Sequence, residues 1–165
     1  MITLRLATLS DIPAIQEISN KTWPVSYKEI ITPEQIQYML ERMYSTSVIT
    51  HSIQDPNQDF WLAEKDGQPV GFCGIEHHCP EAHFTRIHKL YVLPDTHGLG
   101  VGKILLEQAG KEALLRGTTH LHLNVNKHNQ AVAFYNKQGF SIAYEEILDI
   151  GNGFVMDDFV MTKTL

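Results

Sequence analysis

The sequence predicts a three-layer α/β protein with a mixed, mostly antiparallel sheet of about seven strands and about four helices. Three observations predict this class. Alternating apolar runs separated by turn residues indicate antiparallel hairpins in the first half of the chain, and a further hairpin closes it. Between them, a strand, a long amphipathic helix and another strand indicate a parallel pair joined by a right-handed crossover. The 165 residues suit one domain, 1–165, with its own core.

A strand and two helices are expected first. Ile2–Leu6 alternates apolar and polar residues, as a half-buried strand does. A helix should follow and end before Trp23-Pro24, and a second should begin at Thr32-Pro33, with an N-cap threonine and proline at the first helical position. Trp23 and Tyr27 then fall in the loop between the helices. Two interpretations stay open for this pair: they line an acceptor pocket, or they plug the underside of the loop.

A hairpin and a strand–turn–helix unit are expected next. Phe60–Glu64 and Pro69–His77 read as strands joined by a tight turn at Asp66-Gly67. The strand Phe84–Val92 follows and leads through a glycine-rich turn into the amphipathic helix Val101–Arg116. This arrangement predicts an antiparallel meander that feeds the glycine-rich turn.

The last third of the chain supplies the parallel partner and the closing hairpin. The strand His120–Val125 is expected beside Phe84–Val92, because one helix connects them. A short helix capped by Asn129 follows, and then the hairpin Phe140–Ile150 with Phe154–Thr164. These elements complete the predicted seven strands and four helices.

Composition limits the kind of protein this is. Hydrophobic residues make up 43% and charged residues 19%, values typical of a soluble globular domain. The net charge of −6 argues against a nucleic-acid partner and is compatible with a cationic substrate. The N-terminus lacks a signal peptide, no segment reaches the ~20 apolar residues of a membrane span, and two cysteines are too few for a disulfide scaffold. We therefore expect a cytoplasmic protein without membrane association.

The glycine-rich turn is the first candidate for chemistry. It reads His97-Gly-Leu-Gly-Val-Gly-Lys103, with glycine at every second position. Glycine lets a ligand approach the backbone, because no Cβ stands in the way. The turn also opens a helix, whose first N–H groups have no intrahelical partner and whose dipole favours an anion. A phosphate or pyrophosphate site is predicted here, although a ligand-free connection would use the same residues.

Two common phosphate motifs fail at this turn. A dinucleotide fingerprint starting at Gly98 needs glycine where Lys103 stands. A Walker A loop ending at Gly102-Lys103 needs glycine and Ser or Thr at positions that hold His97 and Ile104. A nucleotide-binding α/β protein is therefore disfavoured.

A family resemblance explains the turn better. His97-x-x-Gly100-x-Gly102 resembles the coenzyme A pyrophosphate loop of the GCN5-related N-acetyltransferases (GNAT), which carries Arg or Gln at the first position. The segment Asn129–Phe140, which reads NQAVAFYNKQGF, resembles the other family motif, with Phe-Tyr-x-x-x-Gly-Phe at its end. Both motifs occur in the family's order, and the resemblance extends over Pro69–Phe140. Within the family, the C-terminal hairpin looks most like bacterial enzymes that acetylate polyamines or diamines.

The resemblance implies acetyl-CoA as cosubstrate and a strand that splays from its parallel neighbour. Free backbone amides of that strand would pair with the pantetheine arm and polarise the thioester carbonyl. Histidine in place of Arg or Gln at position 97 would weaken pyrophosphate binding by ~1 kcal/mol, the scale of one hydrogen bond. The residues implied to contact the coenzyme are Leu90, Tyr91, Val92, His97, Gly98, Leu99, Gly100, Val101, Gly102, Lys103, Asn129 and Lys137.

The implied reaction is direct attack of a neutral primary amine on the thioester. Tyr135 matches the family's general acid for the departing thiolate. His88 and Glu76 are alternative general bases, and the sequence leaves the choice between them open. The acceptor would be a polyamine-like small molecule or a peptide. Asp149, Asp157 and Asp158 of the closing hairpin could hold its charge, and solvated hairpin acids explain these residues equally well. A homodimer is an open expectation for its assembly, and a non-catalytic acyl-CoA sensor or interaction domain is the alternative function.

No metal site is expected from the sequence. Its histidines and cysteines between positions 73 and 83 follow the pattern C-x3-H-H-C-x3-H, which matches no common zinc motif. Adjacent histidines on a strand also point to opposite faces, so this pattern cannot converge.

Overall fold

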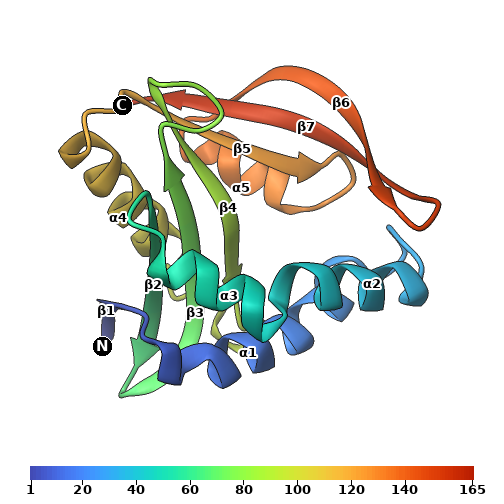
Figure 1. Ribbon diagram of the computed structural model, residues 1–165, viewed down its shortest axis with the longest axis horizontal. Coiled ribbons are helices and arrows are strands. Elements are labelled where there is room, and N and C mark those ends of the chain that lie inside the picture. Colours follow the sequence, from blue (N-terminus) through green and yellow to red (C-terminus); the bar gives the residue numbers. More distant parts are fainter.

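The computed structural model describes residues 1–165 and consists of a seven-stranded sheet with five α-helices (Figure 1). The strands follow the order β1-β2-β3-β4-β5-β7-β6 across the sheet. Their bounds are β1 Ile2–Leu6, β2 Gln58–Lys65, β3 Gln68–His77, β4 Phe84–Val92, β5 His120–Asn126, β6 Ser141–Gly151 and β7 Phe154–Thr164. The helices are α1 Ile12–Ser26, α2 Pro33–Tyr44, α3 Thr46–Gln54, α4 Val101–Leu115 and α5 Ala131–Lys137. The predicted mixed sheet is confirmed, with one helix more than expected.

Helices cover both faces of the sheet, which confirms the three layers (Figure 1). Side chains of α1, α2 and α3 pack with one face into a core of 16 buried residues. Side chains of α4 and α5 pack with the opposite face into a second core of 16 buried residues. No helix combines the length and the apolar composition needed to cross a membrane.

The parallel pair at the centre of the sheet is short. β4 pairs with β5 only where Phe84–Ile87 lies beside His120–Leu123. Beyond that point β4 continues to Val92 on β3 alone, and β5 continues to Asn126 on β7 alone. All other strand pairs are antiparallel. The predicted parallel neighbours are confirmed, and they splay after four residue pairs.

α1 is longer than predicted, and this changes the setting of two aromatic residues. The expectation that the helix ends before Trp23-Pro24 is wrong, because α1 runs to Ser26 with Pro24 inside it. Trp23 is 1% exposed and stacks on Tyr27 with ring centroids 4.4 Å apart. Burial of these two rings offsets the cost of a proline in a helix. They therefore lie in the core rather than in an open loop.

α3 has little signal in the sequence. Its residues include several β-branched and hydroxyl side chains, which are poor helix formers. It forms because the Ser45 hydroxyl accepts a hydrogen bond from the Val48 amide at 3.3 Å and because Ile49 is fully buried against β2 and α1. Tertiary packing therefore decides this helix.

Candidate active site

The glycine-rich turn is open at its centre. Gly98 and Gly100 have φ angles of +87° and +77°, in the left-handed region that favours glycine. No atom lies within 4 Å of where a Cβ would stand at either position. Gly100 is also the N-cap of α4, whose first amides lack intrahelical partners. The turn therefore presents backbone N–H donors, and no side chain fills the space over Gly98 and Gly100.

Gly102 serves packing instead. A Cβ at this position would lie 3.3 Å from the ring of Phe134. Glycine therefore lets α4 and α5 approach each other, and the two family-like motifs touch at this contact. Val101, between the two glycines of the turn, is buried beneath it, and Leu99 is half exposed.

Three basic side chains near the turn, those of His97, Lys103 and Lys137, are exposed to solvent. His97 is exposed, and its Nε2 lies 3.2 Å from the carbonyl oxygen of Val92, so the ring is folded back on the end of β4. Lys103 is exposed and pairs loosely with Glu107 at 4.0 Å. Lys137 is exposed in the last turn of α5.

The edge of β4 beside the turn has no strand partner. Leu90, Tyr91 and Val92 lie past the last residue pair of β4 with β5. Peptide groups that face β5 there must bond to water or to a ligand, since buried or half-buried N–H groups need a partner. An extended ligand with amide groups can therefore add to this edge like a short strand.

A bulge in β4 lies at His88. Ile75 of β3 lies opposite Ile87, and Gly74 lies opposite Lys89, so His88 is an extra residue without a partner. A bulge redirects the following side chains. Ile87 accordingly packs in the core under α4, whereas Lys89 lies on the other face of the sheet, 5.4 Å from the centre of the Tyr44 ring.

The two alternative bases form one hydrogen-bonded pair. Nε2 of His88 lies 2.8 Å from Oε1 of Glu76, and each side chain is 31% exposed. Burial lowers the pKa of His88 below its ordinary 6.5, Glu76 opposes this shift, and the nearby cations Arg86 and Lys89 add to it. His88 is therefore mostly neutral at pH 7. When Glu76 accepts the Nε2–H, Nδ1 is left with the free lone pair.

Tyr135 lies at the buried end of α5. The residue is 7% exposed, and its ring packs edge-on against Phe134 and Phe140. Burial raises the pKa of its hydroxyl above 10, and Cys73 and Tyr27 raise it further. Asn129 caps the same helix, since its Oδ1 accepts a hydrogen bond from the amide of Ala131 at 2.9 Å.

The hydroxyl groups of Tyr27 and Tyr91 meet near Tyr135. Their hydroxyl oxygens are 3.2 Å apart, which links α1 to the splayed part of β4. Burial raises the pKa of both hydroxyls, and for Tyr91 the neighbouring tyrosines, Tyr135 among them, add to the effect. Phenols from three different elements therefore gather around the splay and stay protonated at neutral pH.

A polar cluster on β4, β5, β7 and β6 was not predicted from the sequence, although one of its members, Asp158, was named among the hairpin acids. Asn124 of β5 joins Glu146 at 3.0 Å and Asp158 at 3.4 Å, and its Oδ1 accepts from Arg86 at 3.4 Å. His122 lies beside them. Burial is the main cause that lowers the pKa of its imidazole to about 4, and the charge of Arg86 is the second. The available signal was the alternation of polar residues along β5, a central strand that should be apolar on both faces.

Three atoms of this polar cluster are buried without a hydrogen-bond partner. They are Nε of Arg86, Nδ1 of His122 and Oδ1 of Asp158. Asp158 is 5% exposed, and burial raises the pKa of its carboxyl to about 6. Unpaired buried polar atoms are costly, so such a group suits a ligand that completes its hydrogen bonds.

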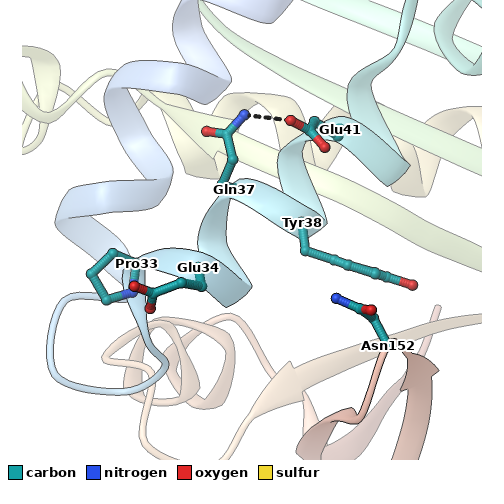
Figure 2. A pocket seen from close by; sticks show the side chains of 6 residues that line it. All are labelled: Pro33, Glu34, Gln37, Tyr38, Glu41 and Asn152. Carbon is teal, nitrogen blue, oxygen red and sulfur yellow. Dashed lines mark hydrogen bonds between the residues drawn. The ribbon is translucent and has the colours of Figure 1, made fainter.

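A surface hollow lies elsewhere. It has a volume of about 530 Å³ between α2 and the turn that joins β6 to β7 (Figure 2). Tyr38 closes one side by donating to the carbonyl oxygen of Ile150 at 2.6 Å. The hollow contains none of the predicted site residues.

Solved structures share this fold. The PaiA N-acetyltransferase from Thermoplasma acidophilum, in complex with coenzyme A, superposes with a TM-score of 0.84 at 24% identity, over 100% of this chain and 99% of the other. A GCN5-related N-acetyltransferase from Rhodopseudomonas palustris superposes with a TM-score of 0.85 at 24% identity, over 99% and 95% of the two chains. The protein therefore has the fold of the acetyltransferase class, as the sequence motifs predicted.

Sequence comparisons give the family. A model of the acetyltransferase (GNAT) domain matches residues 56–142, just over half of the chain, and the chain belongs to this family. An uncharacterized N-acetyltransferase of Mycobacterium tuberculosis is 27% identical over 95% of this chain and 99% of its own length. Spermidine N(1)-acetyltransferase of Thermoplasma acidophilum is 26% identical over 94% and 96%. Peptidyl-lysine N-acetyltransferase YjaB of Escherichia coli is 38% identical over 58% and 59%. The predicted class of enzyme, an N-acetyltransferase, is confirmed.

Proposed function

We propose that the protein transfers an acetyl group from acetyl-CoA to the primary amine of a cationic small molecule or peptide. The observation that carries this proposal is the splay of β4 from β5 beside an unfilled glycine turn. The amides within Leu90–Val92 that face β5 would pair with the pantetheine arm, and those of Gly98 and Gly100–Lys103 would hold the pyrophosphate, because the Leu99 amide already donates to Thr96. The relative that binds coenzyme A shares this fold.

His88 acts as general base in this proposal, with Glu76 as its orienting partner. The acceptor nitrogen loses a proton to Nδ1 of His88, because Nε2 is engaged by the carboxylate. The charge of Glu76 then stabilises the imidazolium that forms. The lowered pKa of His88 keeps the ring ready to accept a proton at neutral pH. Both residues named as alternatives from the sequence therefore have a role in one pair.

Tyr135 serves the leaving group. Its hydroxyl stays protonated because burial raises its pKa, so it can donate a hydrogen bond as negative charge builds on the coenzyme sulfur. The same high pKa means that Tyr135 holds its proton tightly. Its contribution is therefore greatest in the transition state, before the free thiolate has formed.

The acceptor is expected to be cationic. The buried carboxylate of Asp158 lacks a partner for Oδ1, and Glu146 lies beside it on the shared Asn124. Together they suit an ammonium group held away from the reacting amine. Spermidine and peptidyl-lysine, the acceptors in the names of two relatives, both carry a primary amine on a flexible alkyl chain.

A second function has one observation in its favour. His97 replaces the Arg or Gln of the family loop. Its Nε2 is directed at the carbonyl oxygen of Val92, so this N–H is not available to the pyrophosphate. Weaker coenzyme binding would fit a sensor that binds acyl-CoA without consuming it. The His88–Glu76 pair and Tyr135 favour the enzyme.

Binding and turnover together test the proposal. Calorimetry should show one coenzyme A bound per chain. Incubation of acetyl-CoA with a panel of polyamines, amino acids, peptides and aminoglycosides should release free thiol and yield an acetylated amine by mass spectrometry. Absence of coenzyme binding would reject the proposal, and binding without turnover on any amine would favour the sensor.

A further inference from the structure

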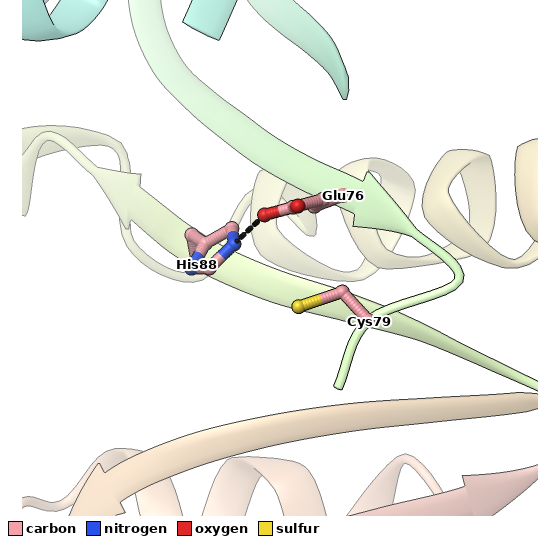
Figure 3. A group of neighbouring side chains, drawn as sticks. All are labelled: Glu76, Cys79 and His88. Atoms are coloured by element: carbon pink, nitrogen blue, oxygen red, sulfur yellow. Dashed lines mark hydrogen bonds and ion pairs between the residues drawn. The ribbon is translucent and has the colours of Figure 1, made fainter. Parts of the chain in front are cut away.

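We propose that Glu76, Cys79 and His88 form a zinc-binding site. Each residue offers one ligand atom, and these atoms lie within 4.8 Å of one another. The three side chains converge from the end of β3, the turn that follows it and the bulge of β4 (Figure 3). No sequence motif predicts this group, because the pairing of β3 with β4 brings His88 to the other two.

The donor set is that of zinc rather than of magnesium or calcium. A thiolate, an imidazole and a carboxylate are all common zinc ligands, and the thiolate disfavours harder cations. Zinc–ligand bonds of about 2.0–2.3 Å would place the ligand atoms about 3–4 Å apart. Glu76 and His88 are now 2.8 Å apart, so they must separate slightly while Cys79 approaches. The approach falls to the side chain of Cys79, because its amide donates to the carbonyl oxygen of Phe84 at 3.1 Å.

The three ligand side chains are accessible to an ion, and they supply three of the four ligands of a tetrahedral zinc site. All three residues are partly exposed, so an ion can enter and a water can take the fourth position. Two ligands are anionic when zinc is bound, which offsets the ion's charge. Arg86 opposes binding, since it lies close to the thiol, but its guanidinium also reaches Asn124 and can turn toward it.

The other histidines of this region are already engaged. His77 is buried, with Nδ1 at 2.9 Å from the Thr85 hydroxyl and Nε2 at 2.7 Å from Asp59. His78 is turned to the carbonyl oxygen of Ala82. Cys73 is buried in the core, 1% exposed. Of the residues in the sequence pattern, only Cys79 is therefore a zinc ligand.

Zinc at this place would inhibit acetyl transfer, a consequence that rests on the proposed function. The ion takes the Nε2 and carboxylate atoms that now bond to each other. The base loses its orienting partner and its freedom to accept a proton. Zinc binding itself does not depend on the enzyme's activity.

Titration of zinc chloride into metal-free protein, without acetyl-CoA, tests the site. The full-length protein should bind one zinc per chain, and cobalt should give a thiolate-to-cobalt absorption band. Cys79→Ser should weaken binding at least about 100-fold and abolish the band. His83→Ala, an exposed histidine on the same turn, should bind zinc as the wild type does. No stoichiometric binding by the wild type, or unchanged binding by Cys79→Ser, would overturn the proposal.

A second readout separates this site from the proposed function. Product amine is measured by mass spectrometry in a zinc buffer, because released coenzyme A itself binds zinc. The wild type should lose activity with zinc, whereas Cys79→Ser should keep its activity at the same zinc concentration. If zinc binds through Cys79 but no amine is ever acetylated, only the proposed function fails. Acetylation without zinc binding contradicts the zinc site alone.

Discussion

Strand register determines the chemistry at His88. Glu76 pairs with Arg86, and His88 stands two residues further along β4, so His88 and Glu76 share a face of the sheet. The imidazole lies within 2.8 Å of that carboxylate at the point where the parallel strands part, and the bulge places Lys89 on the face opposite Ile87. At this scale, acid–base chemistry follows from strand register.

The pH dependence of the reaction tests the role of His88. Because burial lowers its pKa below 6.5, His88 is deprotonated at pH 7, and the rate should fall only as the pH drops below that value. Glu76→Gln removes a charge that raises this pKa, so the fall should move to lower pH. His88→Gln should be slower at every pH and lose this acid limb.

The measurement for this prediction is kcat/KM against pH for the three proteins. A rise toward high pH from deprotonation of the acceptor amine should be common to all of them and serves as the internal control. An acid limb that is identical in His88→Gln and the wild type would remove His88 from the role of base.

Tyr135→Phe should lower kcat by about 100-fold, the scale of one general acid. The phenyl ring keeps the contacts with Phe134 and Phe140, so coenzyme affinity and thermal stability should stay unchanged. Tyr144→Phe, on the exposed side of β6, is the matched control and should have full activity. Wild-type kcat in Tyr135→Phe would exclude the hydroxyl from the reaction. The rates come from thiol release, and the affinities from calorimetry.

At the scale of elements, the glycines of α4 and of the turn before it play opposite parts. Gly100→Ala should lower the free energy of unfolding by about 1 kcal/mol, because its φ of +77° strains any side chain. It should also weaken coenzyme binding, since the new methyl group would occupy the open space beside the backbone N–H donors of the turn. Gly110→Ala, inside α4, should raise stability by up to about 1 kcal/mol, with its Cβ in ordinary contact with Leu165 at 3.4 Å.

Urea unfolding and coenzyme titration of these two variants measure both effects. The same substitution is made in each, so composition is controlled. If Gly110→Ala weakened coenzyme binding as much as Gly100→Ala, the turn would have no special part in binding.

The elements show how far sequence reasoning extends. All seven strands and the parallel pair were predicted, because alternation and turn residues are local signals. The end of α1 and the whole of α3 were not, because burial of Trp23 and Ile49 outweighs local propensity there. The glycine turn was likewise visible as a motif. The polar cluster around Asn124 was not, because it joins four strands that only the sheet order brings together.

The whole molecule combines a rigid sheet with one unpaired interior edge. Antiparallel ladders on both sides hold β4 and β5 in place, and the two cores cover opposite faces. The central strands can therefore splay without unfolding, and the gap opens beside the start of α4. In the proposed function, the coenzyme, the base and the acceptor groups all lie around this gap.

Hydrogen exchange with and without coenzyme A tests the central claim that backbone donors of the splay and the turn hold the coenzyme. At saturating coenzyme, exchange should slow at least about tenfold, or about 1.4 kcal/mol, for the amides within Leu90–Val92 that face β5 and for those of Gly98 and Gly100–Lys103. Amides of the β1–β2 ladder that exchange by local opening should not change. Bound coenzyme that leaves the exchange of both segments unaltered, or protects the hollow beside α2 instead, would contradict the account.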